Sequence, residues 1–172
     1  MNLVSYLKRT INPLIMTNFD ELAPYGEPRS HSATFAVAGV EYRVYFTQIT
    51  KANMYDCAAE FPLDFIFPEY GNHYDVVFDS VQNWKEKTHF KRMENLPNGA
   101  GTRVLKCVER IIIDHYNTFN VALYTFAPAD LKLSGVYCRF VTMKKHRGFT
   151  IEVGLEPEGK ANVLRTPKFY TA

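Results

Sequence analysis

Apolar and polar residues alternate with a period of two in the first half of the chain. Between residues 33 and 49, β-branched and aromatic residues occupy every second position on both sides of Ala38 and Gly39. This alternation predicts a hairpin of two half-buried strands, because glycine supplies the positive φ that a two-residue turn requires. Residues 61–68 and 73–79 predict two more strands, bounded by proline and by a Tyr-Gly-Asn turn. An antiparallel sheet is expected.

The second half of the chain changes to a helical period. Residues 82–101 are polar and mixed in charge, with room for one further strand. After them, apolar residues recur every three or four positions, which predicts an amphipathic helix with Thr102 as its N-cap. Residues 121–126 predict a short strand, 128–147 a second helix that ends at a glycine, and 149–155 a closing strand.

This order of elements, β-β-β-β-α-β-α-β, predicts the α+β class: a mixed, largely antiparallel sheet with an N-terminal β-hairpin region and two covering helices. The length fits a single domain spanning residues 1–172. Within it we expect an N-terminal arm and loop in residues 1–32, an α+β core in 33–155, and a surface tail in 156–172. The tail has the pattern of one edge strand near Val163.

Composition limits the classes of function. The chain is 47% hydrophobic and 15% aromatic, which excludes disorder, and its net charge of +2 is too small for a protein that chiefly coats nucleic acid. Cys57, Cys107 and Cys138 are widely spaced, so they predict neither a disulfide framework nor a metal site. The sequence contains no run of about 18 apolar residues, so no membrane span is predicted. These features favour a cytoplasmic protein without membrane association.

A glycine pair provides the strongest candidate for chemistry. Gly99, Ala100, Gly101 and Thr102 lie where a loop enters the first long helix. Free N–H groups and the helix dipole at such a point favour an anion, for example a pyrophosphate. Glycines also end loops and cap helices without any ligand, so the structural alternative stays open.

With this glycine loop in place, residues 88–155 resemble the layout of the GNAT acyltransferases. The resemblance implies a splayed cleft between the strand before Gly99 and the strand at 121–126, acetyl-CoA as cofactor and N-acyl transfer as activity. The sequence departs from the family pattern at two points. Leu96 stands where the family has Gln or Arg before the glycines, and Lys144 stands where a tyrosine often serves as general acid.

The one dense basic run offers another candidate site. Lys144, Lys145 and Arg147 could contact phosphate, either of CoA or of a nucleic acid. Cations in a last helical turn also stabilise the negative end of the helix, which is the structural alternative.

The titratable residues do not form a complete catalytic set, so the catalytic residues stay unassigned. His73 and Asp75 are two apart on one predicted strand and could share a proton-transfer site. Asp114 and His115 are neighbours on a helix and point about 100° apart, so we expect His115 to be structural. No sequence motif for a nucleophile, a metal or a nucleotide phosphate is present.

The leading functional hypothesis is therefore a non-catalytic protein that binds another protein. Its small size and aromatic content also resemble accessory proteins of tailed phages. Trp84 and Tyr70 are candidate exposed anchors for such an interface. A GNAT-like N-acyltransferase is the first alternative and a weak nucleic-acid binder the second. In the leading hypothesis no cofactor is required.

Overall fold

We describe the fold from a computed structural model. The described residues are 17–22, 28–62, 64–128, 135, 139 and 148–171. The strands and helices among them are β1 (Asp20–Glu21), β2 (Ser30–Val37), β3 (Val40–Gln48), β4 (Asn72–Ser80), α1 (Val81–Glu86), α2 (Ala100–Phe119), β5 (Val121–Phe126), β6 (Thr150–Leu155), β7 (Ala161–Arg165) and the 3-10 helix η1 (Pro167–Tyr170).

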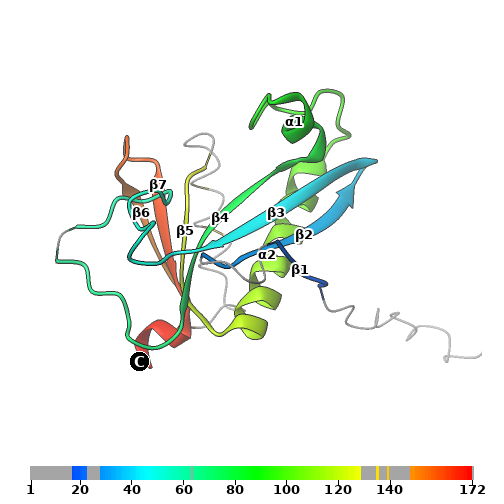
Figure 1. The fold of residues 1–172 in the computed structure, drawn as a ribbon. Coiled ribbons are helices and arrows are strands. Elements are labelled where there is room, and N and C mark those ends of the chain that lie inside the picture. Colours follow the sequence, from blue (N-terminus) through cyan, green and yellow to red (C-terminus); the bar gives the residue numbers. More distant parts are fainter. Residues whose placement is uncertain are drawn as a thin grey trace, which may run out of the picture.

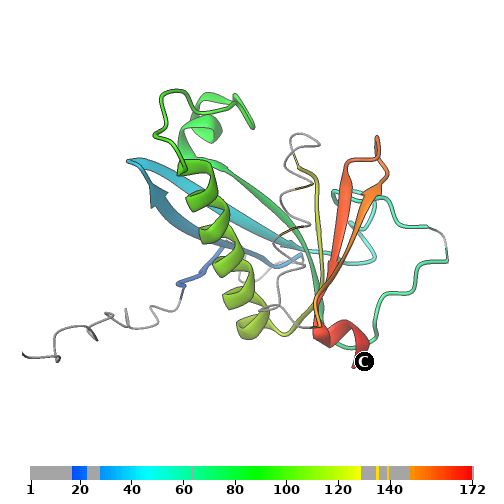
Figure 2. The same cartoon turned by 180° about the vertical axis from the view of Figure 1, so that it is seen from behind.

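The strands form one seven-stranded sheet in the order β1-β2-β3-β4-β5-β7-β6. Every neighbouring pair is antiparallel except β4 and β5, which are parallel. The α+β class with a mixed, largely antiparallel sheet is confirmed. Helix α2 lies across one face of the β2–β4 half of the sheet, behind it in Figure 1 and in front of it in Figure 2.

The predicted hairpin is confirmed. β2 and β3 pair from Ser30 beside Thr47 to Val37 beside Val40. The turn residues Ala38 and Gly39 have φ values of 53° and 79°. Two successive positive φ values belong to the turn type that matches the twist of hairpin strands, so the local sequence determines where the chain reverses.

Helix α2 is amphipathic, as its period predicts. Its buried residues include Val104, Val108, Ile111 and His115, which recur at intervals of three and four and pack against the sheet. The helix ends where Asn120 takes a left-handed conformation with a φ of 52°. Asparagine tolerates that conformation better than most residues, which permits the immediate start of β5.

Two predicted strands are absent from the described chain. Residues 61–68 contain no strand; Phe61, Phe65 and Phe67 instead pack their rings together at centroid distances of 4.5–5.0 Å. Because the three rings pack against one another, the segment does not need to pair with a strand to bury them. The polar stretch after residue 81 contains α1 and irregular chain rather than a further strand.

The C-terminal segment is also different from its prediction. The strand expected at an edge near Val163 is β7, which lies inside the sheet between β5 and β6. Ala161, Asn162, Val163 and Leu164 are all buried, so the segment predicted as a surface tail supplies part of the core. The edge strand is instead β6, which has only β7 as a partner in the described sheet.

Two further predictions lie largely outside the described residues. These are the second helix and the N-terminal arm and loop of residues 1–32, of which residues 17–22 and 28–32 are described and contribute β1 and the start of β2 to the sheet. Within the range of that helix, Gly135 and Arg139 are helical.

Gly71 provides a first test of the fold, because the turn before β4 passes close to β5. Its φ is 96°, and a Cβ atom at this position would lie 2.9 Å from the Cβ atom of Ala122. We expect Gly71→Ala to lower the free energy of unfolding by about 2 kcal/mol or more, through backbone strain and overpacking. Urea unfolding followed by circular dichroism measures this loss.

Gly101→Ala is the matched control, since Gly101 has no positive φ and no described atom within 4 Å of a Cβ atom. In a helical turn this change should be neutral or stabilise by up to about 1 kcal/mol. Equal stability of both alanine variants would contradict the assignment of strain to Gly71.

Candidate functional site

The predicted glycine loop lies at the start of α2. Gly99 precedes the first turn with a φ of 77°, and Ala100 is buried against the core. Thr102 lies inside the first turn and is exposed, so the prediction that it is the N-cap was wrong; the positive φ at the cap favours glycine. The surroundings of Gly99 and Gly101 are open.

The other predicted phosphate contacts, Lys144, Lys145 and Arg147, lie outside the described residues. Their role stays a prediction.

The most distinctive feature of the sheet is the place where β4 and β5 part. Only four residue pairs join these parallel strands, and the last pair is Asp75 beside Thr125. We call this pair the fork. From Val76 onward β4 pairs with β3 but no longer with β5. Figure 1 shows β4 leaning away from β5 beyond the fork.

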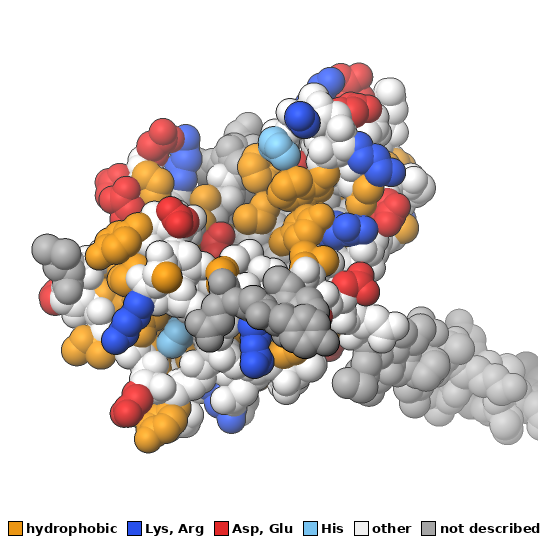
Figure 3. Space-filling view, in the orientation of Figure 1, with side chains coloured by type: hydrophobic (Ala, Val, Ile, Leu, Met, Phe, Trp, Pro, Cys, Tyr) orange, Lys and Arg blue, Asp and Glu red, His pale blue; other side chains and the backbone are white. Residues whose placement is uncertain are grey.

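A cavity of about 530 Å³ occupies the space beyond the fork. Its walls come from β4, from the flank of α2, and from the ends of β5 and β7. Figure 3 shows hydrophobic side chains gathered in a hollow on one face of the molecule, with Lys and Arg at its edge. A volume of this size is typical of small-molecule sites. Apolar wall residues include Val76, Phe78, Leu105, Val108, Ile112 and Phe126.

One buried carboxylate organises the polar part of the cavity wall. Asp79 is 7% exposed, and its Oδ1 accepts from Ser80 N (2.7 Å) and from Asn83 Nδ2 (2.6 Å). Its Oδ2 accepts from the backbone N–H of Phe90 at 2.6 Å. Burial, and then the charge of Asp79, raises the pKa of Tyr42 on the same wall. Three donors therefore hold the two oxygens of this carboxylate in place.

Residues 87–96, which connect α1 toward α2, run along the rim of the cavity; we call them the strap. Phe90, Lys91, Arg92, Met93 and Leu96 of the strap line the cavity, whereas the glycine loop does not. Sequence reasoning missed these residues because the strap has neither period nor motif. The available signal was weak: Lys91 and Arg92 are adjacent cations within a polar stretch that precedes a helix.

The fork itself carries a second carboxylate. Asp75 Oδ1 accepts from the Thr125 hydroxyl and from Ala58 N, the latter at 2.9 Å. Burial raises the pKa of Asp75, although these hydrogen bonds oppose the change. His73 forms no hydrogen bond with Asp75, and its Nε2 is buried without a partner in the described chain. The structure therefore shows no direct hydrogen bond for the proton-transfer site that this pair could have shared.

A chain of buried titratable groups lies behind the fork. His31 Nδ1 and His115 Nε2 are 3.0 Å apart, and His115 Nδ1 lies 3.0 Å from the Tyr124 hydroxyl. The ring of Phe46 stacks on His115 with a centroid distance of 3.8 Å. Burial, and then the charge of His31, lowers the pKa of His115 to about 2. The structural role expected for His115 fits this environment.

Other kinds of site find no support in the described part of the chain. There, no three His, Cys, Asp or Glu residues are grouped closely enough to bind a metal ion. None of the helices described there is both long and apolar enough to cross a membrane. Cys57 donates toward two backbone carbonyls, and burial raises its pKa, which disfavours the nucleophilic thiolate.

The chain matches no protein-family model, no curated protein and no solved structure. Function must therefore be argued from the site itself.

Proposed function

We propose that the chain binds an acyl-CoA in the cavity beyond the fork and transfers the acyl group to an amine. The observation that carries this proposal is the parting of β4 and β5 around an apolar cavity. The resemblance to GNAT acyltransferases implies a splayed cleft between the strand before Gly99 and the strand at 121–126; the last strand before Gly99 is β4, which precedes the residues 88–155 that carry the resemblance.

The chemistry of a strand edge supports a ligand of this shape. Beyond the fork, β4 has a partner on one side only, so alternate N–H and C=O groups from Val76 to Ser80 face the gap. A narrow ligand arm that carries amides can continue the ladder there, as extended peptides do at other sheet edges. The pantetheine arm of CoA has two amides and apolar links, and apolar walls suit those links.

Acyl transfer also needs a proton acceptor for the attacking amine. As the amine nitrogen bonds to the thioester carbon, the C–S bond breaks, the thiolate leaves and the nitrogen loses a proton. Asp75 is the carboxylate at the fork, and burial brings its pKa closer to neutrality. Asp75 does not line the cavity, however, and of the carboxylates among the described wall residues Asp79 has both oxygens held by donors, so no base is assigned.

Calorimetric titration with CoA and acetyl-CoA tests the proposal, together with a variant that fills the cavity. Leu105 lines the cavity, whereas Lys106 is the next residue on α2 and is exposed. We expect Leu105→Trp to weaken CoA binding at least tenfold, because the larger ring occupies the volume of the ligand arm. Lys106→Trp should leave binding unchanged. Absence of CoA binding by the unaltered chain, or equal binding by both variants, would refute the proposal.

A second candidate, the non-catalytic protein that binds another protein, has its own supporting observation. Tyr55, Ile66 and Tyr70 are exposed on the segment from Lys51 to Gly71. Exposed large apolar side chains are candidate anchors for a protein interface. Trp84 is not among them: it is half-buried against Tyr45 and His89.

A thermal-shift series with CoA, acetyl-CoA and single-stranded DNA separates these candidates, since a ligand that binds only the native state raises Tm. No shift with any of the three would favour the protein-interaction hypothesis.

A further inference from the structure

The strap is held to the protein by buried polar groups rather than by packing alone. Asp79 accepts from Phe90 N at 2.6 Å, and Asn83 Nδ2 donates to the carbonyl of Lys91 at 2.8 Å. The N–H of Lys91 donates to the carbonyl of Thr88 at 3.0 Å. Both peptide groups that flank the Phe90 to Lys91 step are therefore fixed. The side chains that follow are presented at a defined place on the cavity rim.

Two of these side chains are cations with no carboxylate partner in the described chain. Lys91 and Arg92 are exposed and line the cavity. Of the other charged wall residues, Asp79 is held by three donors and Lys160 pairs with Glu158, while Glu109 has an interaction of its own. The rim at the strap therefore presents positive charge beside an apolar interior.

This pairing of charge and cavity selects an amphipathic ligand with an anionic end. An apolar wall weakens the screening of a nearby charge, so phosphate oxygens at the rim gain more from Lys91 and Arg92 than they would in open water. A guanidinium can also bind phosphate with two parallel hydrogen bonds.

We propose that Lys91 and Arg92 of the strap bind the phosphate groups of the ligand, in place of the N-terminus of α2. This inference rests on the proposed function and deepens it. Gly99, Ala100, Gly101 and Thr102 do not line the cavity, whereas the two cations do. Leu96, which replaces the Gln or Arg expected before the glycines, also lines the cavity and extends its apolar wall. Phosphate recognition has moved from the helix start to the strap.

A two-way comparison of protein and ligand tests this assignment. CoA carries the phosphates, whereas pantetheine has the same arm without them. We expect the double variant Lys91→Gln, Arg92→Gln to bind CoA at least tenfold more weakly, since each hydrogen bond to a charged group is worth roughly a factor of ten. Binding of pantetheine should be unchanged. Calorimetric titration measures both.

The matched control is Lys85→Gln with Lys87→Gln, which removes the same charge from α1 and the start of the strap but touches no wall of the cavity. It should bind CoA as the unaltered chain does. The ring of Trp84, the single tryptophan, lies 4.9 Å from that of His89 on the strap, so its fluorescence reports whether the strap is still in place.

The outcomes are distinguishable. Unchanged CoA binding by the Lys91, Arg92 variant overturns the inference and leaves the proposed function standing. An equal loss of CoA and pantetheine binding, or an equal loss in the Lys85, Lys87 control, also overturns it. If the unaltered chain binds pantetheine but gains nothing from the phosphates of CoA, the inference alone fails. Binding of neither ligand would overturn both proposals.

Discussion

The free energy of unfolding is expected to fall by about 2 kcal/mol or more when the pH is lowered from about 7 to about 5. The main cause is His115, which is fully buried and whose pKa burial lowers to about 2. Below a pH of about 6.5, His115 is protonated in the unfolded chain but not in the folded chain. The free energy of unfolding therefore falls by about 1.4 kcal/mol for each further pH unit, until the pKa of the folded state is reached.

The neighbouring groups determine the size of this loss. Burial also lowers the pKa of His31 and lowers that of His73 to about 4, and both changes add to the loss in the same direction. Two charged rings would direct N–H groups at each other across the His31 to His115 contact. Asp75 has the opposite effect. Because its pKa is raised in the folded state, the folded chain takes up a proton at Asp75 before the unfolded chain does, and this increases the free energy of unfolding as the pH falls toward that pKa.

The variant His115→Leu tests this assignment. It should unfold more easily at neutral pH, since His31 and Tyr124 each lose a partner, at a cost of about 2 kcal/mol. Its stability should nevertheless depend less on pH than that of the unaltered chain. His89 is exposed, and His89→Gln is the control that should leave the slope unchanged. Parallel pH profiles for the unaltered chain and His115→Leu, measured by urea unfolding, would contradict the prediction.

Substitution of Asp79 is expected to produce the second large effect. Asp79→Ala leaves Ser80 N and Phe90 N without their acceptor and removes one of the two acceptors of Asn83 Nδ2, and we expect a loss of about 3 to 5 kcal/mol. Asp79→Asn is more selective. Its amide oxygen can keep the two contacts of Oδ1, but its NH₂ group would face the N–H of Phe90. We expect it to lose about 1 to 3 kcal/mol.

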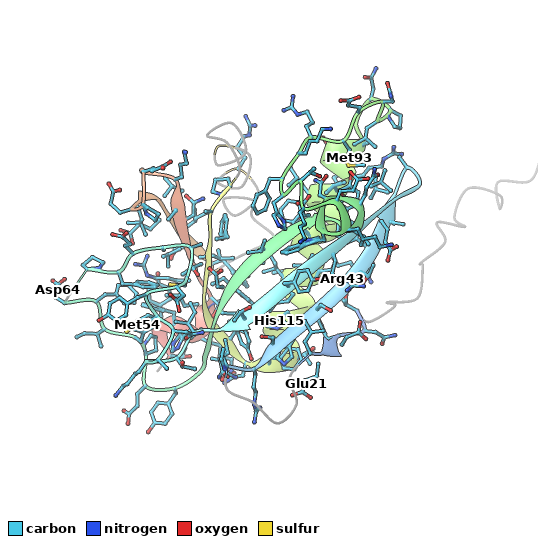
Figure 4. The ribbon with its side chains drawn as sticks, turned by 45° about the horizontal axis from the view of Figure 1, so that its top comes forward. Glu21, Arg43, Met54, Asp64, Met93 and His115 are labelled. Carbon is cyan, nitrogen blue, oxygen red and sulfur yellow. The ribbon has the colours of Figure 1, made fainter. Side chains whose placement is uncertain are left out.

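Asp64→Asn is the control for this pair of variants. Asp64 is exposed, and Figure 4 places it on the opposite side of the molecule from Met93 of the strap. It should change stability by no more than about 0.5 kcal/mol. Tryptophan fluorescence separates the strap from the core, because release of Phe90 withdraws His89 from Trp84. Asp79→Asn with unaltered stability and unaltered fluorescence would show that the carboxylate does not hold the strap.

Elements with local periodicity could be predicted from the sequence. The hairpin around Ala38 and Gly39, helix α2 and strand β5 follow from residue patterns within one element. In α2 the buried face and the period agree, β5 is a short apolar run that is buried almost throughout, and Gly39 has the positive φ that glycine permits. Strand β5 occupies the predicted residues 121–126.

Features that depend on distant partners could not be predicted in this way. A strand near Val163 was predicted, but at an edge of the sheet. Strand β7 instead lies between β5 and β6, with Asn162 buried, and the following Thr166 donates to the carbonyl of Val121. The Phe61 to Phe67 segment is rich in β-prone residues, yet its rings find partners in one another. In both cases the outcome depends on tertiary contacts, and local propensity carries no information about them.

The candidate site likewise has one part that could be predicted from local sequence and parts that could not. The glycine loop is a local feature and lies at the helix start, as predicted, although it is separate from the cavity wall. The strap depends on Asp79, eleven positions before Phe90, and a lone Asp at the end of a strand has no distinguishing pattern. The cavity depends on where two strands stop pairing, a property of three-dimensional register.

The fork has a mechanical consequence. Four residue pairs couple β4 to β5 before the fork and none couples them beyond it, so the two parts of the sheet are joined along one side of the cavity only. A molecule bound in the cavity would contact both parts and would oppose a change in their separation. Ligand binding would then restrict the motion of the end of β4 and of the strap relative to β5.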